Sequence, residues 1–296
     1  MQSVKPRRKV DLVPYLFIGP QLILFAIFFI IPAAIGIYAA FSKWNIYTDP
    51  FPIFNGLSNF QQILLDTSTS FSKNFWTGMG NTLLFVVVCV PFCILLPLFM
   101  AVLLSLKPKG HGFFQALFYL PNILSISSVI LIWFYVFNRN EGLLNNVFHT
   151  NINWLGSQPS AWSAIVIVTV WWCLGGNLVI YLAAINGVSR EIQEAADIDG
   201  AGLCRKYFRI ILPCIKPQLS YTIVLTTIGQ FNLYGQPLML TSGGPNNSTH
   251  TMMMYIREGA FGTSSVAGIS ASMALLIGIV MIVASVVLRK VTGDAE

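Results

Sequence analysis

Six long stretches of the sequence contain no lysine, arginine, aspartate or glutamate. They cover residues 12–42, 74–106, 110–138, 142–189, 217–256 and 259–288. Each is longer than the roughly 20 residues with which an apolar helix crosses a 30 Å hydrocarbon layer. Backbone amides in lipid must be bonded within their own element, so these stretches predict helices. We expect one all-α membrane domain over residues 1–296, with six spans near residues 14–40, 82–106, 114–137, 162–186, 218–240 and 266–288.

The composition agrees with a chain that faces a lipid bilayer. Hydrophobic residues make up 55% of the sequence and charged residues only 9%, whereas soluble domains have about 25% charged residues. The alternative, buried helices of a soluble protein, would need amphipathic helices to cover them. The sequence leaves none for that purpose, so a soluble fold is not expected.

The basic residues predict how the chain is oriented. If the first span begins inside, 13 of the 17 lysines and arginines fall on one side, namely Lys5, Arg7, Arg8, Lys9, Lys107, Lys109, Arg190, Arg205, Lys206, Arg209, Lys216, Arg289 and Lys290. The positive-inside rule then places both termini and the segment 190–213 in the cytoplasm. The net charge of +6 is explained by this topology and by anionic lipid headgroups, so no nucleic-acid partner is expected. We also expect the first span to stay uncleaved, because it lacks a small-residue cleavage site.

Several kinds of chemistry are not indicated. The three histidines lie in three different loops, and neither a metal-binding spacing nor a phosphate-binding glycine loop occurs. No nucleophile motif is present, and no ionisable group lies deep in a span as in proton-driven carriers. Cys89, Cys93 and Cys173 lie in spans and Cys204 and Cys214 in the cytoplasm, where thiols stay reduced. We expect no catalytic residue, metal or bound cofactor in this chain.

An acidic segment, EIQEAADIDGAG at residues 191–202, stands out in a chain with 11 acidic residues. Ser189 is a plausible N-cap for a short helix over residues 190–198, which the sequence DGAG interrupts. A second helix over residues 203–211 is expected to stop before Pro213, and Gly200 permits the sharp turn between the two.

This predicted hairpin has two interpretations. Ala195 and Ala196 share a helical face with Ile192 and Asp199, and small side chains let another protein approach closely. The hairpin would then dock on a cytoplasmic partner. Alternatively, it is a solvated loop held by charge pairs. Physical reasoning alone leaves both open.

The segment EAADIDGAGLCRKYFRIILP (residues 194–213) resembles the signature of the membrane subunits of binding-protein-dependent ABC importers. That signature is Glu-Ala-Ala, three residues, Gly, nine residues and Ile-x-Leu-Pro, and this sequence matches every fixed position. The resemblance implies the type I importer permease fold and a coupling helix that sits on a cytoplasmic ATPase. Glu194 would contact the ATPase and Gly200 would form the turn. The coupling residues are then Glu191, Glu194, Ala195, Ala196, Asp199, Gly200, Ala201 and Gly202, and ATP and magnesium would be bound by the ATPase subunits.

Similar segments occur along nearly the whole chain. Three segments are similar to segments of sugar-importing permeases, namely FNGLSNFQQIL, FFQALFYLPNILS and GLLNNVF. The loop with Gly243, Gly244, Pro245 and Thr249 resembles that of the maltose and glycerol-phosphate type of permease. The resemblance implies a second, non-identical permease, two ATPase subunits, an external solute-binding protein and a bacterial plasma membrane. It also implies a carbohydrate substrate, expected to be an oligosaccharide. The first loop, residues 42–80, is far shorter than in the maltose permease, and that protein's extra N-terminal spans are not expected here.

Polar residues predict where a substrate would pass. Thr222, Thr226, Gln230 and Tyr234 recur every four residues and form one stripe on the fifth span. The resemblance places the substrate site on the fourth and fifth spans, so the candidates are Trp171, Trp172, Asn177, Tyr181, Thr226, Gln230, Asn232 and Tyr234. Hydrogen bonding between helices is the alternative for the polar residues, and it is favoured for Thr222. Interface anchoring is the alternative for the tryptophans.

The sequence therefore predicts a non-enzymatic permease subunit of an ATP-driven carbohydrate importer. One competing hypothesis is an ion-gradient-driven sugar carrier or a passive pore that works without an ATPase. Another is a membrane scaffold whose hairpin only recruits a partner. Pro20, Pro32, Pro91 and Pro97 can bend their spans, but prolines are common in membrane helices, so they assign no gate.

Overall fold

The computed structural model describes residues 13–263 and 265–293. The basic cluster Lys5, Arg7, Arg8 and Lys9 lies outside the described residues. The elements before the second long helix are α1 (Val13–Phe25), η1 (Ala26–Ile30), α2 (Ile31–Ala40), β1 (Ser42–Lys43), β2 (Ile53–Phe54) and α3 (Ser58–Leu64). The central elements are α4 (Ser70–Ser105), α5 (His111–Ile123), α6 (Ile126–Val136), α7 (Leu143–Phe148) and α8 (Ser160–Asn186). The remaining elements are α9 (Arg190–Ile198), α10 (Leu203–Lys206), η2 (Tyr207–Ile211), α11 (Leu212–Cys214), α12 (Lys216–Phe231), α13 (Gly235–Thr241), α14 (Met252–Phe261) and α15 (Ala267–Thr292).

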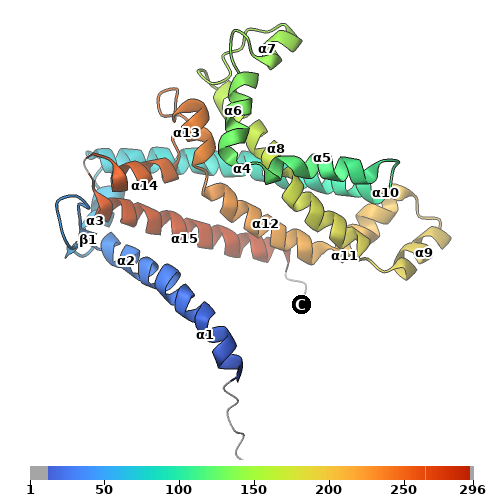
Figure 1. Ribbon diagram of the computed structural model, residues 1–296, viewed down its shortest axis with the longest axis horizontal. Helices are drawn as coiled ribbons and strands as arrows, with labels where there is room; N and C mark the ends of the chain where they lie inside the picture. The colour runs from blue at the N-terminus through green and yellow to red at the C-terminus, as the bar shows by residue number, and fades with distance from the viewer. Residues whose placement is uncertain (1–12, 264, 294–296) are drawn as a thin grey trace, which may run out of the picture.

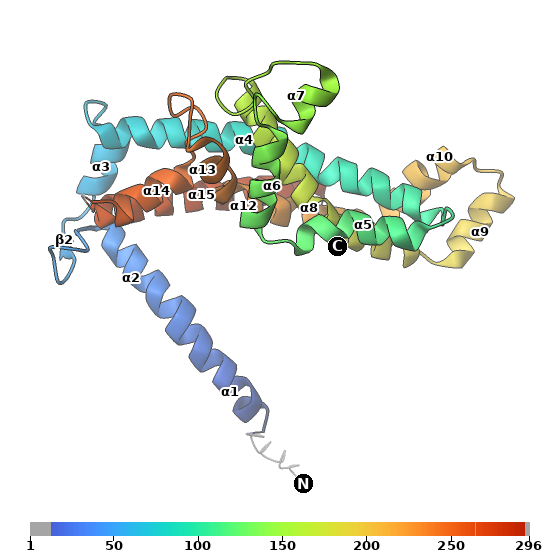
Figure 2. The same cartoon turned by 45° about the horizontal axis from the view of Figure 1, so that its top comes forward.

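The helices form an elongated bundle. In Figures 1 and 2, α4, α12, α14 and α15 lie along the long axis, and α8 and α5 pack beside the second half of α4. The short strands β1 and β2 pair antiparallel, with Ser42 opposite Phe54. They and α3 lie at one end of the bundle, and α9 and α10 lie at the other. The two loop regions that the charge distribution assigns to opposite sides of the membrane are thus at opposite ends.

The prediction of an all-α membrane protein is confirmed. Among the described residues, four helices are long and apolar enough to cross a membrane: Leu16–Ala40, Ser70–Ser105, Ser160–Asn186 and Ala267–Thr292. α4 begins well before the predicted residue 82, because Thr69 caps it and accepts a hydrogen bond from the Ser72 amide at 3.3 Å. The count of six spans stays a prediction, since the third and fifth predicted spans are interrupted.

The third predicted span, 114–137, is not one straight helix. α5 and α6 meet at an angle of 102° across Leu124 and Ser125. Ser125 caps α6, with its hydroxyl accepting from the Ser128 amide at 3.3 Å. The Trp172 indole donates to the Leu124 carbonyl at 3.1 Å. Side-chain hydrogen bonds therefore replace the helical bonds at this break, which lets the backbone turn inside an apolar region.

The fifth predicted span, 218–240, is also broken. α12 has 16 residues, about 24 Å of helix, which is shorter than a typical hydrocarbon core. It ends at Phe231, and the chain turns before α13. The Thr251 hydroxyl donates to the Leu233 carbonyl at 2.8 Å. The side-chain amide of Asn232 donates to the Ile228 carbonyl at 2.9 Å. A continuous helix would have paired the Ile228 carbonyl with the backbone N–H of Asn232, whereas the Leu233 carbonyl would lack a helical donor in any case because residue 237 is proline.

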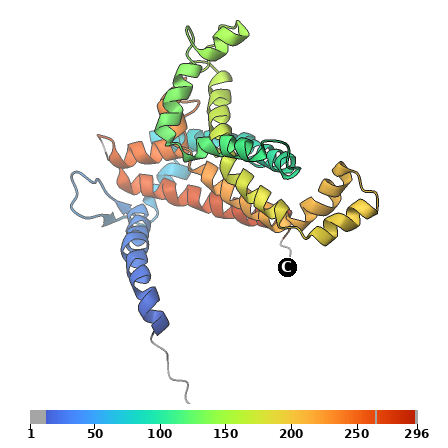
Figure 3. The same cartoon turned by 45° about the vertical axis from the view of Figure 1, so that its right-hand side comes forward.

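The first span packs least. α1, η1 and α2 run without a break from Val13 to Ala40, as predicted, but they diverge from the bundle (Figure 3). Nearly every described side chain before Ala39 is exposed, and most are large and apolar. Only the end of α2 packs, against the start of α15. Such a surface suits a hydrocarbon environment and not water.

Gly175 allows α8 to cross α5 at close range. A Cβ atom at residue 175 would lie 2.7 Å from the Tyr119 Cα and 3.0 Å from the Phe118 carbonyl oxygen. At the adjacent Gly176 the nearest atoms belong to the Asn122 side chain at 3.8 Å, an ordinary contact. Backbone atoms cannot rotate away as a side chain can. Of these two adjacent positions, therefore, residue 175 has to be glycine and residue 176 does not.

We predict that Gly175→Ala destabilises the fold by about 1–3 kcal/mol, because the added methyl group forces α5 and α8 apart. Gly176→Ala is the matched control and is expected to change stability little. Thermal unfolding of the two purified variants in detergent measures the difference. Equal melting temperatures would contradict the close crossing at Gly175.

Candidate functional site

The segment 190–213 folds into the predicted helical hairpin. Ser189 caps α9, and its hydroxyl accepts from the Ile192 amide at 3.3 Å. Gly200 follows with a φ of +70°, the left-handed conformation that favours glycine. The predicted end of the second leg is wrong. That leg runs without a break through α10, η2 and α11 to Cys214, with Pro213 inside it. The π-helical turn η2 ends just before the proline, and the missing N–H of Pro213 leaves the Arg209 carbonyl, four residues earlier, without its usual helical donor.

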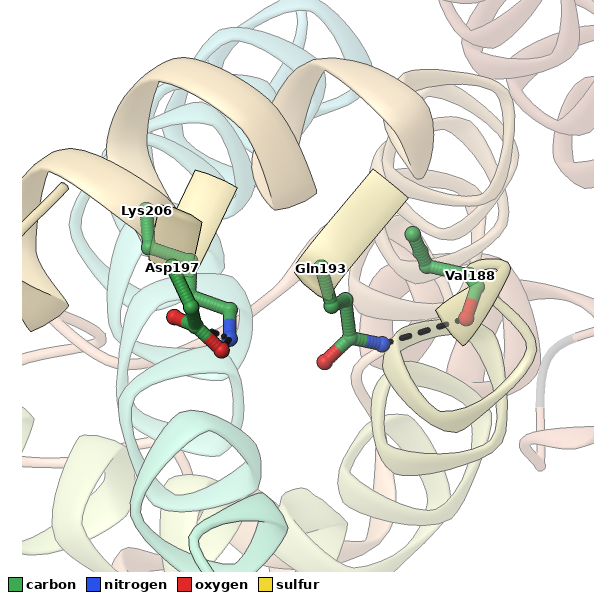
Figure 4. Close-up of polar contacts among 4 residues, drawn as sticks. All are labelled: Val188, Gln193, Asp197 and Lys206. Carbon is green, nitrogen blue, oxygen red and sulfur yellow. Dashed lines mark hydrogen bonds and ion pairs between the residues drawn. The ribbon is translucent and has the colours of Figure 1, made fainter. Parts of the chain in front are cut away.

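Two side-chain contacts fix the hairpin's shape (Figure 4). The Lys206 ammonium bridges both Asp197 carboxylate oxygens at 2.8 and 2.9 Å and joins the two legs. The Gln193 amide donates to the Val188 carbonyl at 3.1 Å and joins α9 to the end of α8. Asp197 is 60% exposed, so the ion pair contributes only about 0–1 kcal/mol. Its effect is to hold the two legs in one geometry.

The outer surface of the hairpin has no partner in the described chain. Glu194 is exposed, and no hydrogen bond or ion pair to its carboxylate occurs among residues 13–263 and 265–293. Ile198 is 87% exposed, and Leu203 and Phe208 are also exposed. Leu203 and Phe208 line an apolar groove beside α4, and Ile198 lies outside that groove. An exposed isoleucine one helical turn from the exposed Glu194 carboxylate favours an interaction surface on α9.

The predicted coupling residues differ in exposure. Ala196 is only 4% exposed, so its methyl group is covered by the chain itself and not free to face a partner. Ala201 is half-buried. The rest of the set is exposed, namely Glu191, Glu194, Ala195, Asp199, Gly200 and Gly202. Of the two alanines on the predicted docking face, only Ala195 is accessible.

The second leg anchors the hairpin to the bundle. The Tyr207 hydroxyl lies 2.8 Å from the Ser105 hydroxyl at the end of α4. Ile211 and Ile215 are buried in a cluster with Ala101 and Leu104 of α4 and with side chains of α8. The Ser105 hydroxyl also lies 2.7 Å from the Val102 carbonyl, to which it donates. Tyr207 is therefore the donor to Ser105.

The polar stripe of α12 faces α8. Thr222 pairs with Tyr181 through their hydroxyl groups at 2.7 Å, and the Asn177 amide donates to the Thr226 hydroxyl at 3.0 Å. The Gln230 amide lies 3.7 Å from the Cys173 sulfur. We call these six residues the polar seam. The three pairs are one helical turn apart on antiparallel helices, which is the interhelical hydrogen bonding that the sequence left as the alternative.

The other substrate-path candidates lie around the two helix breaks. Trp172 bonds the α5–α6 break, and Trp171 packs edge-on against Trp133 at 5.6 Å. Trp171 also lines an apolar cavity of about 700 Å³ between α4, α5 and α8. Asn232 is exposed at the end of α12, and the Arg257 guanidinium lies 5.6 Å from the centre of the Tyr234 ring. The structure therefore brings Asn177, Tyr181, Thr226 and Gln230 together but not the tryptophans, Asn232 or Tyr234. The role of all eight in a substrate path stays a prediction.

Sequence reasoning missed two features. Cys173 belongs to the polar seam, and its spacing of four residues from Asn177 was a usable signal. The loop after α13 closes on itself, with the Thr241 and Thr249 hydroxyls 2.7 Å apart. The Asn81 amide of α4 donates to the carbonyls of Asn247 and His250, both at 2.9 Å. No local pattern points to Asn81.

The cysteines divide into two groups. Cys89 and Cys93 are fully buried, with their sulfurs 3.6 Å apart, and Cys173 is partly buried in the seam. Cys204 and Cys214 are exposed on the second leg of the hairpin. Within the described ranges, no group of three or more His, Cys, Asp and Glu residues is arranged to hold a metal ion.

A family model matches most of the chain. Residues 63–293 match the family described as the binding-protein-dependent transport system inner membrane component. The match contains α4 through α15, and therefore the hairpin and the seam.

Two relatives extend the similarity over nearly the full length. The probable starch degradation products transport system permease protein AmyD of Thermoanaerobacterium thermosulfurigenes is 31% identical, covering 95% of this chain and 94% of that protein. The sn-glycerol-3-phosphate transport system permease protein UgpA of Escherichia coli O6:K15:H31 (strain 536 / UPEC) is 30% identical, covering 100% and 99%.

A solved structure shares the fold. It is a chain of the bacterial alginate ABC transporter in complex with an alginate pentasaccharide-bound periplasmic protein. The TM-score is 0.80 at 21% identity, with 95% of this chain and 96% of that chain covered.

We predict that Gly200→Ala loosens the hairpin by about 1–2 kcal/mol, because an L-residue is strained at a positive φ. Gly202→Ala is the control, since Gly202 has a φ of −62° and a Cβ atom added at either glycine would meet no atom within 4 Å. Hydrogen exchange of the amides of residues 191–206 measures the effect. Equal exchange in the two variants would contradict the turn described at Gly200.

The loop after α13 is expected to lose stability in acid. Burial lowers the pKa of His250, and the Glu258 carboxylate, 3.2 Å from Nε2 but outside hydrogen-bond alignment, only partly opposes this. Below the ordinary histidine pKa of about 6.5, the folded loop therefore binds fewer protons than the unfolded loop. The loop has its full stability above that pH and loses stability as the pH falls from there toward the lower pKa that His250 has in the folded loop. Hydrogen exchange of residues 241–251 at pH 7 and pH 5, corrected for intrinsic rates, measures this. In His250→Phe the acid sensitivity should disappear, and an unchanged sensitivity would contradict it.

Proposed function

Because the chain belongs to the family of binding-protein-dependent transport system inner membrane components, the permease subunits of ABC importers, we propose that it forms half of the membrane path of a carbohydrate importer. In this proposal the hairpin 190–213 receives the movement of a cytoplasmic ATPase. The chain itself performs no bond chemistry and binds no cofactor, and ATP and magnesium are held by the ATPase subunits.

The relatives support a carbohydrate substrate. AmyD is named for starch degradation products and UgpA for sn-glycerol-3-phosphate, and the alginate transporter is a neighbour in fold. A phosphate substrate favours arginine or lysine partners, yet the six predicted spans contain neither. The hydroxyl and amide groups of the seam are bonded to one another between α8 and α12, so they give no argument for either substrate. Because the spans lack arginine and lysine, a neutral oligosaccharide fits this chain better than an anionic polyol phosphate.

The proposed assembly follows from the family. A second, non-identical permease completes the path, two ATPase subunits bind on the cytoplasmic side, and an external solute-binding protein delivers the sugar. The complex is placed in a bacterial plasma membrane, with both termini in the cytoplasm because most basic residues flank that side. ATP-driven closure tilts the hairpin and switches the path between outward and inward access.

The exposed surface of the hairpin is the observation that carries the proposal. Glu194 and Ile198 are exposed on α9. The ion pair between Asp197 and Lys206 joins the two legs, and Tyr207 attaches the second leg to α4. The packing of Tyr207 and Ile211 against the end of α4 gives a push on the hairpin a direct route into the bundle. A passive pore or an ion-driven carrier has no use for such a surface.

Glu194→Ala tests the coupling. We expect it to lower uptake about tenfold or more in proteoliposomes that contain both permeases, the ATPases and the binding protein, because a central contact with the ATPase is lost. ATPase assembly, measured by co-purification, should fall with it. Glu141→Ala removes an exposed carboxylate outside the hairpin and should leave assembly unchanged.

Two outcomes would contradict the proposal. Normal uptake and assembly in Glu194→Ala would remove the role of the hairpin. Uptake by the chain alone, without ATPases, that follows an ion gradient or runs passively would favour the carrier or pore.

A further inference from the structure

Pro97 leaves a backbone carbonyl without its helical partner in the middle of α4. Proline has no N–H, so the Cys93 carbonyl, four residues earlier, loses its donor. Both residues are buried within the bundle, where water cannot supply the missing bond. An unpaired carbonyl in such a place costs about 1–3 kcal/mol.

Asn177 of α8 supplies the missing donor. Its side-chain nitrogen donates to the Cys93 carbonyl oxygen at 2.9 Å and to the Thr226 hydroxyl of α12 at 3.0 Å. A carbonyl oxygen only accepts, so the NH₂ end of the amide must face α4. Both N–H groups are then used, one on α4 and one on α12. The amide joins three helices at the level of the proline.

The other proline in α4 provides a contrast. Pro91 removes the donor for the Val87 carbonyl in the same way. No side chain of the described residues donates to that carbonyl, and Val87 is exposed on the surface of the bundle. Of these two carbonyls of α4, the Cys93 carbonyl receives a side-chain bond from another helix and the Val87 carbonyl receives none from the described residues.

The part of α4 beyond Pro97 is attached to the hairpin. Tyr207 donates to Ser105 at 2.8 Å, and Ile211 packs with Ala101 and Leu104. A movement of the hairpin therefore reaches residues 98–105 directly. It reaches the rest of α4 along the helix through Pro97, where the missing backbone bond makes the helix easier to bend, and also through α8, which packs against both α4 and the second leg.

We propose that Asn177 is a positioning residue that replaces the missing backbone bond at Pro97 and so sets the angle between the two halves of α4. The half beyond Pro97 moves with the hairpin, and its role in transport rests on the function proposed above. Asn177 then acts on the helix and not on the sugar, in contrast to its predicted place in the substrate path.

A double-mutant cycle tests the inference in the assembled transporter. Asn177→Ala should lower the melting temperature by about 2–8 °C, because the Cys93 carbonyl is left unpaired. In a Pro97→Ala background the same change should cost much less, since residue 97 then supplies its own N–H. Pro91→Ala is the matched control and should not reduce the cost of Asn177→Ala.

Uptake kinetics give an independent measurement. Asn177→Ala should lower the maximal rate and leave the KM for the sugar unchanged, and Pro97→Ala should restore the rate. If Asn177→Ala lowers the melting temperature equally, or prevents assembly equally, in the wild-type and Pro97→Ala backgrounds, the proposal is overturned. A KM raised by the same factor in both backgrounds would also overturn it, because Asn177 would then contact substrate. If no variant, wild type included, takes up sugar while the melting temperatures show the rescue, the proposed function fails and the positioning role stands.

Discussion

The requirement that every backbone polar group be bonded inside the protein governs this fold. In water a broken helix can bond solvent, but in a hydrocarbon layer the replacement must come from the chain. Three interruptions have one: Trp172 and Ser125 at the α5–α6 break, Thr251 after α12, and Asn177 opposite Pro97. The Val87 carbonyl opposite Pro91, on the exposed side of α4, receives no side-chain bond from the described residues. Several polar side chains of the spans, among them Trp172 and Asn177, are therefore partners of particular backbone groups.

This explains which parts of the fold the sequence predicts. Long charge-free stretches and a serine N-cap are local signals, and they placed the first, fourth and sixth spans and the first leg of the hairpin correctly. The breaks depend on donors far away in the chain, since Trp172 is 48 residues from Leu124 and Thr251 is 18 from Leu233. A pattern read over one or two helical turns contains no information about them.

The candidate site shows the same division. The four-residue spacing indicated one polar stripe, which the structure shows for Thr222, Thr226 and Gln230. Tyr234 does not belong to the stripe, since α12 ends at Phe231. The spacing did not indicate that Tyr181, Asn177 and Cys173 of α8 would pair with the stripe. The hairpin was accessible to sequence reasoning because its helix cap, its glycine turn and its motif are contiguous. The attachment of the second leg to α4 could not be predicted in this way, because Ser105 lies about a hundred positions before Tyr207.

The division of the five thiols has a practical consequence. Cys89 and Cys93 are sealed between helices and Cys173 is partly covered, whereas Cys204 and Cys214 stand open on the same leg of the hairpin. A maleimide-linked fluorophore or spin label added to the unaltered chain should attach there first. The molecule thus comes with attachment points for a spectroscopic probe on the very element whose displacement a kinetic study would want to follow.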